Sequence, residues 1–141
     1  MCIISGVEKT IGIKNIKFKG TGKKGRGVFA LRDFKKGELI ESAPVLTFTP
    51  KERKILEKTL LNFYIYPWRS TRGASLALGY GSIYNHSYTP NADWKQNFKA
   101  MAMEYRVIKN IKNGEQITIN YNGEPDDTKK IDFSEWTDAA E

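Results

Sequence analysis

The stretch from Gly79 to Asn91 constrains the fold of this chain more than any other segment. It reads GYGSIYNHSYTPN, and its glycines and proline oppose a long regular helix, because glycine is entropically costly there and proline lacks the backbone donor. The segment also contains His86, the only histidine of the chain, together with three tyrosines. Such a density of polar and aromatic groups is typical of a site. We therefore predict an ordered, irregular loop with a functional role.

The length of 141 residues predicts one domain, because a chain of this size can enclose a single core. We assign residues 1–141 to that domain. No apolar run reaches the length of about 20 residues that a membrane helix needs, and the N-terminus lacks the pattern of a signal peptide. The sequence thus predicts a soluble, intracellular protein that does not bind a membrane.

Cysteine and histidine are too scarce for a metal site built by the protein. The chain has one cysteine, Cys2, and one histidine, so it offers no CxxC or HxH pair. Lys and Arg outnumber Asp and Glu by 23 to 16, which gives a net charge of +7. This charge favours association with polyanions such as nucleic acid, but a solvated basic surface explains it equally well. The densest basic cluster runs from Lys14 to Arg26.

A glycine-rich segment at 20–27 contains the pattern GxGxxG. In a dinucleotide-binding fold this pattern opens a helix whose N-terminal amides bind the pyrophosphate. Here it is followed by Val28-Phe29-Ala30-Leu31, which is short and strand-like. The pattern therefore predicts no dinucleotide site. Without a GK[ST] ending, it is no phosphate-binding P-loop either.

Two segments repeat one turn device. Residues 33–40 (DFKKGELI) and 110–117 (NIKNGEQI) both place Gly-Glu before a strand, and a glycine there can adopt positive φ. Thr49, Pro50 and Glu52 together form the start signal of a helix, which we place at about residues 50–61. The remaining pattern predicts strands, expected within 1–19 and at 63–68, 74–78, 93–99, 100–108 and 116–121.

Three motifs in order resemble the SET domain, a family of lysine methyltransferases that use S-adenosylmethionine. They are KGRGVFA at 24–30, YNHS at 84–87 with Pro90-Asn91, and GEQITINY at 114–121. The resemblance covers about residues 14–123 and leaves 124–141 as a C-terminal tail that closes the site. It implies a mainly β fold with one short helix, in which small curved sheets are crossed by the C-terminal segment in a pseudoknot-like arrangement.

The resemblance also implies roles for individual residues. Tyr121 would be the catalytic tyrosine, near both the methyl group and the target amine. The segment from Gly25 to Gly27 would contact the amino-acid end of the cofactor, and Asn85 and His86 would hold its amino group and its adenine. The residues that it places around the cofactor are Lys24, Gly25, Arg26, Gly27, Tyr84, Asn85, His86, Tyr121, Phe133 and Trp136.

An aromatic sleeve suits a lysine substrate, because the stem of lysine is apolar and its head gains from cation–π contact. Tyr64, Tyr80, Tyr84 and Trp94 are the candidates, although aromatic residues also fill the cores of small β folds. Ile119 stands where this family often controls how many methyl groups are added, and its size would permit di- or trimethylation. The cysteine-rich segments of many members are absent, so the C-terminal aromatic residues would close the site without zinc.

Two other function classes remain open from the sequence. The chain could bind the cofactor and a lysine peptide without turnover, as a reader or scaffold. It could instead be a basic nucleic-acid-binding module with exposed aromatic residues that stack on bases. A hydrolase is disfavoured, because no nucleophile elbow or Ser-His-Asp set is visible.

The expected substrate of a methyltransferase is a basic or nucleic-acid-associated protein, histone-like in character, located in the cytoplasm, nucleus or nucleoid. An acidic rim could attract it, with candidates Glu104, Glu124, Asp126 and Asp127.

Overall fold

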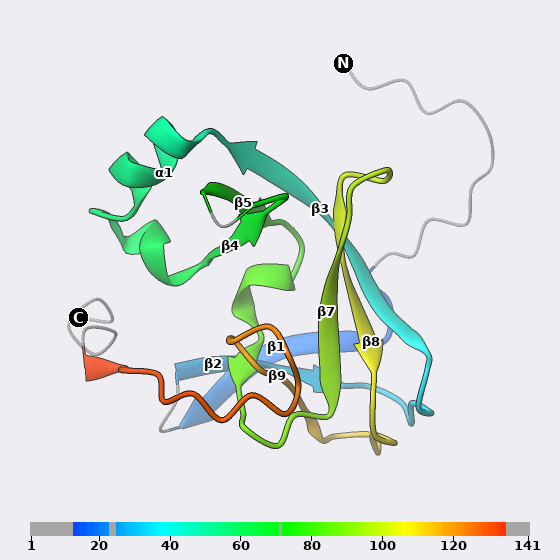
Figure 1. Ribbon diagram of the computed structural model, residues 1–141. Coiled ribbons are helices and arrows are strands. Elements are labelled where there is room, and N and C mark those ends of the chain that lie inside the picture. Colours follow the sequence, from blue (N-terminus) through cyan, green and yellow to red (C-terminus); the bar gives the residue numbers. More distant parts are fainter. Residues whose placement is uncertain (1–12, 23–24, 71, 135–141) are drawn as a thin grey trace.

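Two curled β-sheets, described here from a computed structural model, make up most of the fold (Figure 1). The structure describes residues 13–22, 25–70 and 72–134. The first sheet has the order β1-β2-β9-β6, with strands β1 (Ile16–Gly22), β2 (Gly25–Ala30), β9 (Gln116–Ile119) and β6 (Asn85–His86). The second has the order β4-β5-β3-β8-β7, with strands β4 (Ile65–Trp68), β5 (Gly73–Ala77), β3 (Leu39–Phe48), β8 (Ala102–Val107) and β7 (Ala92–Asn97). The mainly β architecture expected from the sequence is confirmed.

The described glycines of the glycine-rich segment lie in β1 and β2, where Gly22 pairs with Gly25, and a strand follows them in place of a helix. Gly22 and Gly25 have φ values of 81° and 72°, which allow the tight reversal between antiparallel strands. The strand predicted after the glycines is therefore confirmed, and the helix that a dinucleotide loop requires is replaced by β2. The predicted hairpin of 93–99 and 100–108 is also confirmed, because β7 and β8 pair in antiparallel register over their whole length.

The two repeated turns lie against each other. Gly37 and Gly114 both have positive φ, at 94° and 90°, as the shared pattern predicted. Phe34 and Ile111 exchange two backbone hydrogen bonds of 2.8 and 2.9 Å between the turns. The two similar sequence segments thus form two turns that are hydrogen-bonded to each other, and these turns join the start of β3 to the start of β9.

Helix α1 (Pro50–Leu56) begins where the sequence predicted but ends early. Its capping box is complete: the Glu52 amide donates to the Thr49 hydroxyl, and the Glu52 carboxylate accepts from the Thr49 amide. The predicted end at residue 61 is wrong. The Thr59 hydroxyl donates to the Leu56 carbonyl at 2.7 Å and accepts from the Leu61 amide, which ends one helix and caps the short 3-10 helix η1 (Leu60–Phe63).

Smaller differences in strand ends have a local cause. Strand β4 begins at Ile65 because Phe63 belongs to η1, and β9 ends at Ile119, so that Tyr121 lies beyond the strand. The loop from Gly79 to Asn91 is irregular as predicted, but it contains the 3-10 helix η2 (Gly81–Ile83) and the two-residue strand β6. No described helix has both the length and the apolar character needed to cross a lipid bilayer.

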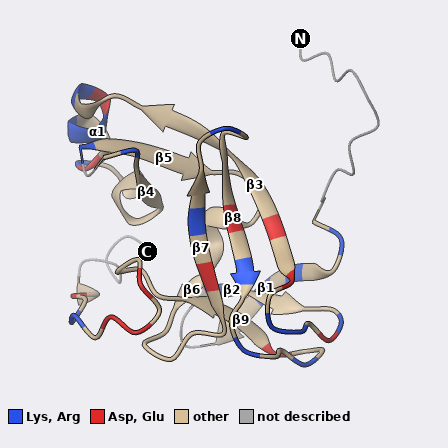
Figure 2. Ribbon diagram, turned by 45° about the vertical axis from the view of Figure 1, so that its right-hand side comes forward, with Lys and Arg blue, Asp and Glu red and all other residues tan. Residues whose placement is uncertain are grey.

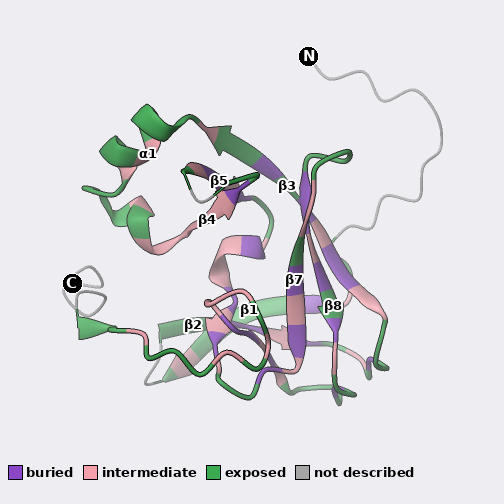
Figure 3. Ribbon diagram, in the orientation of Figure 1, coloured by how far each residue is buried: buried purple, intermediate pink, exposed green. Residues whose placement is uncertain are grey.

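Buried hydrophobic residues come from both sheets, among them residues of β2 and β9 in the first and of β3 and β8 in the second (Figure 3). Aliphatic side chains of the first sheet, such as Val28 and Ile117, are fully enclosed. From the second sheet and the loop come two buried tyrosines, Tyr105 and Tyr84. By contrast, α1 has no buried residue, so packing contributes little to its length.

Candidate active site

The site is built where the loop from Gly79 to Asn91, called here the histidine loop, crosses strand β9. Strand β6 pairs with β9 in parallel, with Asn85 opposite Thr118 and His86 opposite Ile119. Asn91 locks the crossing, because its Nδ2 donates to the Gln116 carbonyl at 2.8 Å and its Oδ1 accepts from the Thr118 amide at 2.9 Å. The loop and the last strand, distant in sequence, therefore form one rigid unit.

Tyr121 lies two residues beyond the end of β9 and is held by hydrogen bonds at its backbone amide and at its hydroxyl. Its backbone amide donates to Nδ1 of His86 at 3.1 Å, and its hydroxyl donates to the Tyr84 carbonyl at 2.7 Å. Burial raises the pKa of the Tyr121 hydroxyl well above its ordinary value, and the nearby Tyr64 raises it further. The hydroxyl therefore stays protonated and can act as a fixed hydrogen-bond donor or orienting group.

A ledge of backbone and amide groups, made by Arg26, Gly27, Asn85 and Gln116, lies where side chains join β6 to β2 and β9. The Asn85 Nδ2 donates to the Arg26 carbonyl at 2.9 Å and to Oε1 of Gln116 at 2.8 Å. A Cβ on Gly27 would collide with both side-chain amides. Glycine is thus required for strand β2 to approach Asn85 and Gln116 this closely. Gln116 was missed in the sequence analysis, although it lies within the GEQITINY motif.

An aromatic cluster covers the histidine side of the crossing. The centroid of the His86 ring lies 4.3 Å from that of Tyr88, 5.2 Å from that of Tyr121 and 5.7 Å from that of Phe133. The tail that carries Phe133 is fastened by hydrogen bonds: the Ile131 amide donates to the Tyr88 hydroxyl at 2.9 Å. Docking of the tail onto the body is therefore observed for Phe133. Trp136, like Lys24, lies outside the described residues.

Side-chain amides hold the start of the tail. The Asn120 Nδ2 donates to the Asp127 carbonyl at 2.7 Å, and the Asn122 Nδ2 donates to the Lys129 carbonyl at 2.8 Å. No group of three or more potential metal ligands occurs among the residues that the structure describes. In this part of the chain, hydrogen bonds fix the tail.

These features coincide with a known family. Residues 25–122 match the SET domain. The chain belongs to the SET domain family. It is 37% identical over 107 residues to a histone-lysine N-methyltransferase of Schizosaccharomyces pombe described as specific for H3 lysine 37, an alignment that spans 75% of this chain and 72% of the relative.

Solved structures agree with this assignment. A Plasmodium falciparum protein named as a candidate histone methyltransferase superposes with a TM-score of 0.63 at 32% identity, over 77% of this chain and 93% of that one. The Polycomb Repressive Complex 2 of Chaetomium thermophilum, bound to S-adenosylmethionine, gives a TM-score of 0.66 at 20% identity over 78% of this chain and 15% of that one, which shows a shared fold. As a SET domain protein, the chain is a protein-lysine methyltransferase with S-adenosylmethionine as methyl donor.

The residues of the SET domain crossing fit that donor. The Asn85 Nδ2 group already donates to the Arg26 carbonyl and to Oε1 of Gln116, so the groups that could hold the amino-acid end of the donor are Oδ1 of Asn85 and the backbone of Gly25 and Gly27. The rings around His86 suit a flat heterocycle. The close approach that only glycine allows at position 27 supports the same fit.

The aromatic residues predicted to line the lysine channel lie in different surroundings. Trp94 is buried, its ring lies 4.9 Å from that of Tyr66, and its Nε1 donates to the Asn120 carbonyl. The Tyr80 ring packs on Phe18 of β1 at 5.8 Å. Tyr64 is half-buried and close enough to Tyr121 to affect its pKa.

Two candidates have side chains in the core. Ile119 is completely buried, and so is the ring of Tyr84, of which the site receives the backbone carbonyl. The sequence analysis did not single out Tyr66 and Tyr105, whose hydroxyls lie 2.7 and 2.8 Å from the Gly81 carbonyl. The alternation of Tyr64 and Tyr66 in the FYIYPW segment was a signal for the first; nothing local distinguished Tyr105.

Proposed function

We propose that this protein methylates a lysine of a histone tail, in a narrow channel that ends at Tyr121. The carrying observation is the 2.7 Å hydrogen bond between the Tyr121 hydroxyl and the Tyr84 carbonyl, next to the ledge formed by Gly27 and Asn85. The identity of 37% to a histone-lysine methyltransferase supports a histone as substrate. A nuclear location follows from the same proposal.

S-adenosylmethionine, when bound, supplies a methyl group on a positively charged sulfur. The task of the protein is then to align a neutral amine with it, and positioning of this kind lowers barriers by several kcal/mol. A lysine has a free pKa of about 10.4, and burial among aromatic rings favours the uncharged form. The Tyr121 hydroxyl and the Tyr84 carbonyl orient the amine, so no carboxylate base is needed.

The ledge would bind the amino-acid end of the cofactor, and the aromatic cluster would bind its heterocycle. In this proposal Gly25, Arg26 and Gly27 contact its amino-acid end through backbone groups, and Asn85 binds its amino group. His86 and Phe133, whose ring centroids lie 5.7 Å apart, would form an aromatic surface that borders the heterocycle. A role for Trp136 or Lys24 stays a prediction from the sequence.

An acidic rim would offset the repulsion between a basic enzyme and a basic tail. Asp93 of β7 lies near Glu124 at the start of the C-terminal tail; burial raises the pKa of Asp93 first, and the charge of Glu124 raises it further. Lys95 lies 3.9 Å from the Asp93 carboxylate and is highly exposed. Because Lys95 already offsets the charge of Asp93, Glu124 with the neighbouring Asp126 and Asp127 would supply the negative charge that attracts a lysine-rich peptide locally despite the net charge of +7. The distribution of charge over the ribbon is shown in Figure 2.

The hairpin of β1 and β2 would bind nucleic acid alongside the histone. No acidic residue occurs between Ile13 and Arg32. Lys17 and Lys19 are exposed on β1, and the Lys19 ammonium lies 4.3 Å from the centroid of the Phe29 ring. Exposed cations interleaved with aromatic rings are the pattern that binds phosphates.

The test is methyl transfer from labelled cofactor to histone octamers, to nucleosomes and to histone H3 tail peptides, with mass spectrometry to locate the modified lysine. We expect label on one tail lysine in all three substrates. Cofactor binding without transfer to any histone lysine would instead indicate a reader or a different substrate.

Charge reversal separates the nucleic-acid contact from the chemistry. The double variant Lys17→Glu/Lys19→Glu should lower activity on nucleosomes and leave activity on peptides nearly unchanged, because only nucleosomes present phosphates. Lys51→Glu/Lys54→Glu, on exposed positions of α1, is the matched control. Equal loss on both substrates would contradict the nucleic-acid contact.

A further inference from the structure

We propose that Glu41, a buried carboxyl group on β3, is a positioning residue for methyl transfer: it holds Tyr84 from behind, so that the Tyr84 carbonyl meets the Tyr121 hydroxyl. This inference rests on the proposed catalytic role of Tyr121. Glu41 was not among the residues that the sequence motifs pointed to.

Glu41 binds both ends of the segment that leads into the site. Its Oε1 accepts a hydrogen bond of 2.9 Å from the Tyr84 hydroxyl, and its Oε2 accepts one of 3.0 Å from the Tyr80 amide. The two bonds enclose η2 and fix the loop at residues 80 and 84. Both donors belong to the histidine loop, although Glu41 is about 40 positions earlier in the chain.

Burial of a carboxyl group costs desolvation free energy, which simple packing of the loop would not require. Glu41 is 1% exposed, and no ion pair among the described residues includes it. Burial of such a group costs free energy that its hydrogen bonds offset only in part. An apolar residue could fill the same volume without this desolvation cost. What Glu41 adds is therefore its two directed hydrogen bonds.

The loop conformation is adapted to this carboxyl group. Gly79 has a φ of 63°, and a Cβ there would collide with Oε2 of Glu41. Glycine at this position lets the backbone pass directly over the carboxyl group before the Tyr80 amide donates to it. The bend of the loop and the position of Glu41 are therefore matched.

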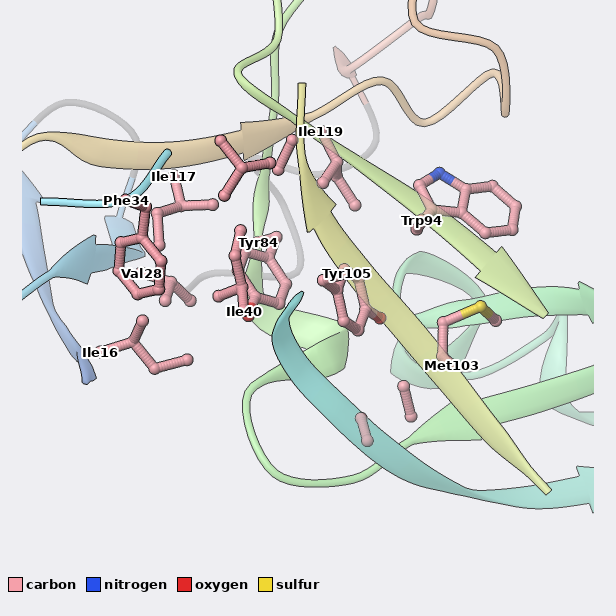
Figure 4. Packing of buried hydrophobic residues seen from close by; sticks show 14 of the residues in the cluster. Ile16, Val28, Phe34, Ile40, Tyr84, Trp94, Met103, Tyr105, Ile117 and Ile119 are labelled. Atoms are coloured by element: carbon pink, nitrogen blue, oxygen red, sulfur yellow. The ribbon is translucent and has the colours of Figure 1, made fainter. Parts of the chain in front are cut away.

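The ring of Tyr84 transmits the constraint to its own carbonyl. It stacks on the ring of Tyr105 with centroids 4.4 Å apart and an interplanar angle of 28° (Figure 4). With the hydroxyl tied to Glu41 and the ring against Tyr105, the side chain has one position, and this fixes the backbone of residue 84. The carbonyl then lies 2.7 Å from the Tyr121 hydroxyl.

Two conservative variants test the proposal. Tyr84→Phe removes the hydroxyl and keeps the ring, whereas Glu41→Gln keeps the volume but presents an NH₂ group to one of the two donors. We expect kcat for methyl transfer to fall by about tenfold in each, because small displacements of reacting groups are costly. Cofactor Kd and cofactor KM should stay within about twofold, since the ledge at Gly27 is untouched.

Ser82→Ala is the matched control. Its hydroxyl donates to the Ala77 carbonyl at 3.0 Å and so also ties the loop to the second sheet, but away from Tyr84. We expect a comparable loss of thermal stability with kcat unchanged. The double variant Glu41→Gln/Tyr84→Phe should lose no more than about tenfold in kcat, because both changes disrupt the same hydrogen bond between the Tyr84 hydroxyl and Glu41.

Several results would overturn the proposal. If kcat of Tyr84→Phe and Glu41→Gln equals that of the unmodified protein, or if Ser82→Ala loses as much, then Glu41 has no specific role in positioning. A parallel loss of cofactor affinity and kcat, including failure to fold, would assign Glu41 to stability alone. Tyr121→Phe measured alongside keeps the two proposals apart: full activity of that variant would reject the role of Tyr121 whatever Glu41 does.

Discussion

The first and second halves of the histidine loop are anchored to different sheets by different chemistry. The first half, residues 79–84, is tied to the five-stranded sheet by hydroxyl and carboxyl groups, with Tyr66 and Tyr105 at the Gly81 carbonyl and Glu41 at its two ends. The second half, residues 85–91, is tied to β9 by side-chain amides and strand pairing. One loop thus joins the two sheets at the site.

This difference assigns separate tasks to the two halves. The first half presents a backbone carbonyl to Tyr121 from within a buried, aromatic environment, where hydrogen bonds are strong and rigid. The second half presents amides next to exposed backbone of β2, which suits reversible binding of a polar ligand. Changes in the first half should therefore affect the rate of transfer, and changes in the second half should affect cofactor affinity or stability.

The largest effect is expected at the point where the halves meet. Tyr121→Phe should lower kcat by roughly 100- to 1,000-fold, because it removes the hydroxyl that, together with the Tyr84 carbonyl, orients the reacting amine in this proposal. Cofactor affinity, measured by titration calorimetry, should change by less than about twofold. A variant that retains full activity would show that the halves do not converge on Tyr121.

A change on the cofactor side should act on affinity. Gly27→Ala would push a methyl group into Asn85 and Gln116, and a displacement of these groups worth roughly 1–3 kcal/mol of binding corresponds to a cofactor Kd raised about 5- to 150-fold. Gly20→Ala is the control in the same hairpin, because a Cβ there meets no atom within 4 Å. Equal Kd values for the two variants would contradict the ledge.

The crossing itself can be weakened through Asn91. Asn91→Ala removes two hydrogen bonds to β9 and should lower the free energy of unfolding by about 2 kcal/mol, measured by urea denaturation. Asn110→Ala, which removes one exposed bond from the Lys36 amide, should cost less than about 1 kcal/mol. If the order of the two losses is reversed, Asn91 is not the main lock.

The pH profile distinguishes the substrate amine from Tyr121. Burial is the main factor that raises the Tyr121 pKa above its ordinary value of 10.0, so its hydroxyl stays protonated up to that pH. We expect log kcat/KM to rise with pH as the substrate lysine loses its proton and to show no fall below pH 10. A descending limb between pH 8 and 10 that disappears in Tyr121→Phe would show that this hydroxyl titrates normally.

The smallest effect is expected from metal removal. The tail is fastened by Asn120 and Asn122, and the described residues contain no cluster of metal ligands. Dialysis against a chelator should therefore leave methyl transfer unchanged, in an assay run with and without added zinc. A loss of activity that zinc restores would show that closure of the site needs a metal.

Local signals in the sequence were reliable wherever short-range physics decides. The Thr49 capping box, the glycines of the repeated turns and the β7–β8 hairpin depend on residues within a few positions, and all three are present. The end of α1 was not predictable in the same way. It depends on competition between the Thr59 hydroxyl and the next helical turn, which the apolar spacing did not reveal.

The sequence by itself determined the family, the mainly β class, and the segments that carry Asn85, His86 and Tyr121, because each motif is contiguous. Only the tertiary structure decided that Glu41, Gln116 and Tyr105 lie beside those segments, and that Ile119 and the ring of Tyr84 lie in the core. The reason is physical: hydrogen bonds and ring stacking act over a few ångströms, whereas these partners are separated by 20 to 40 or more positions and meet only after the sheets have formed.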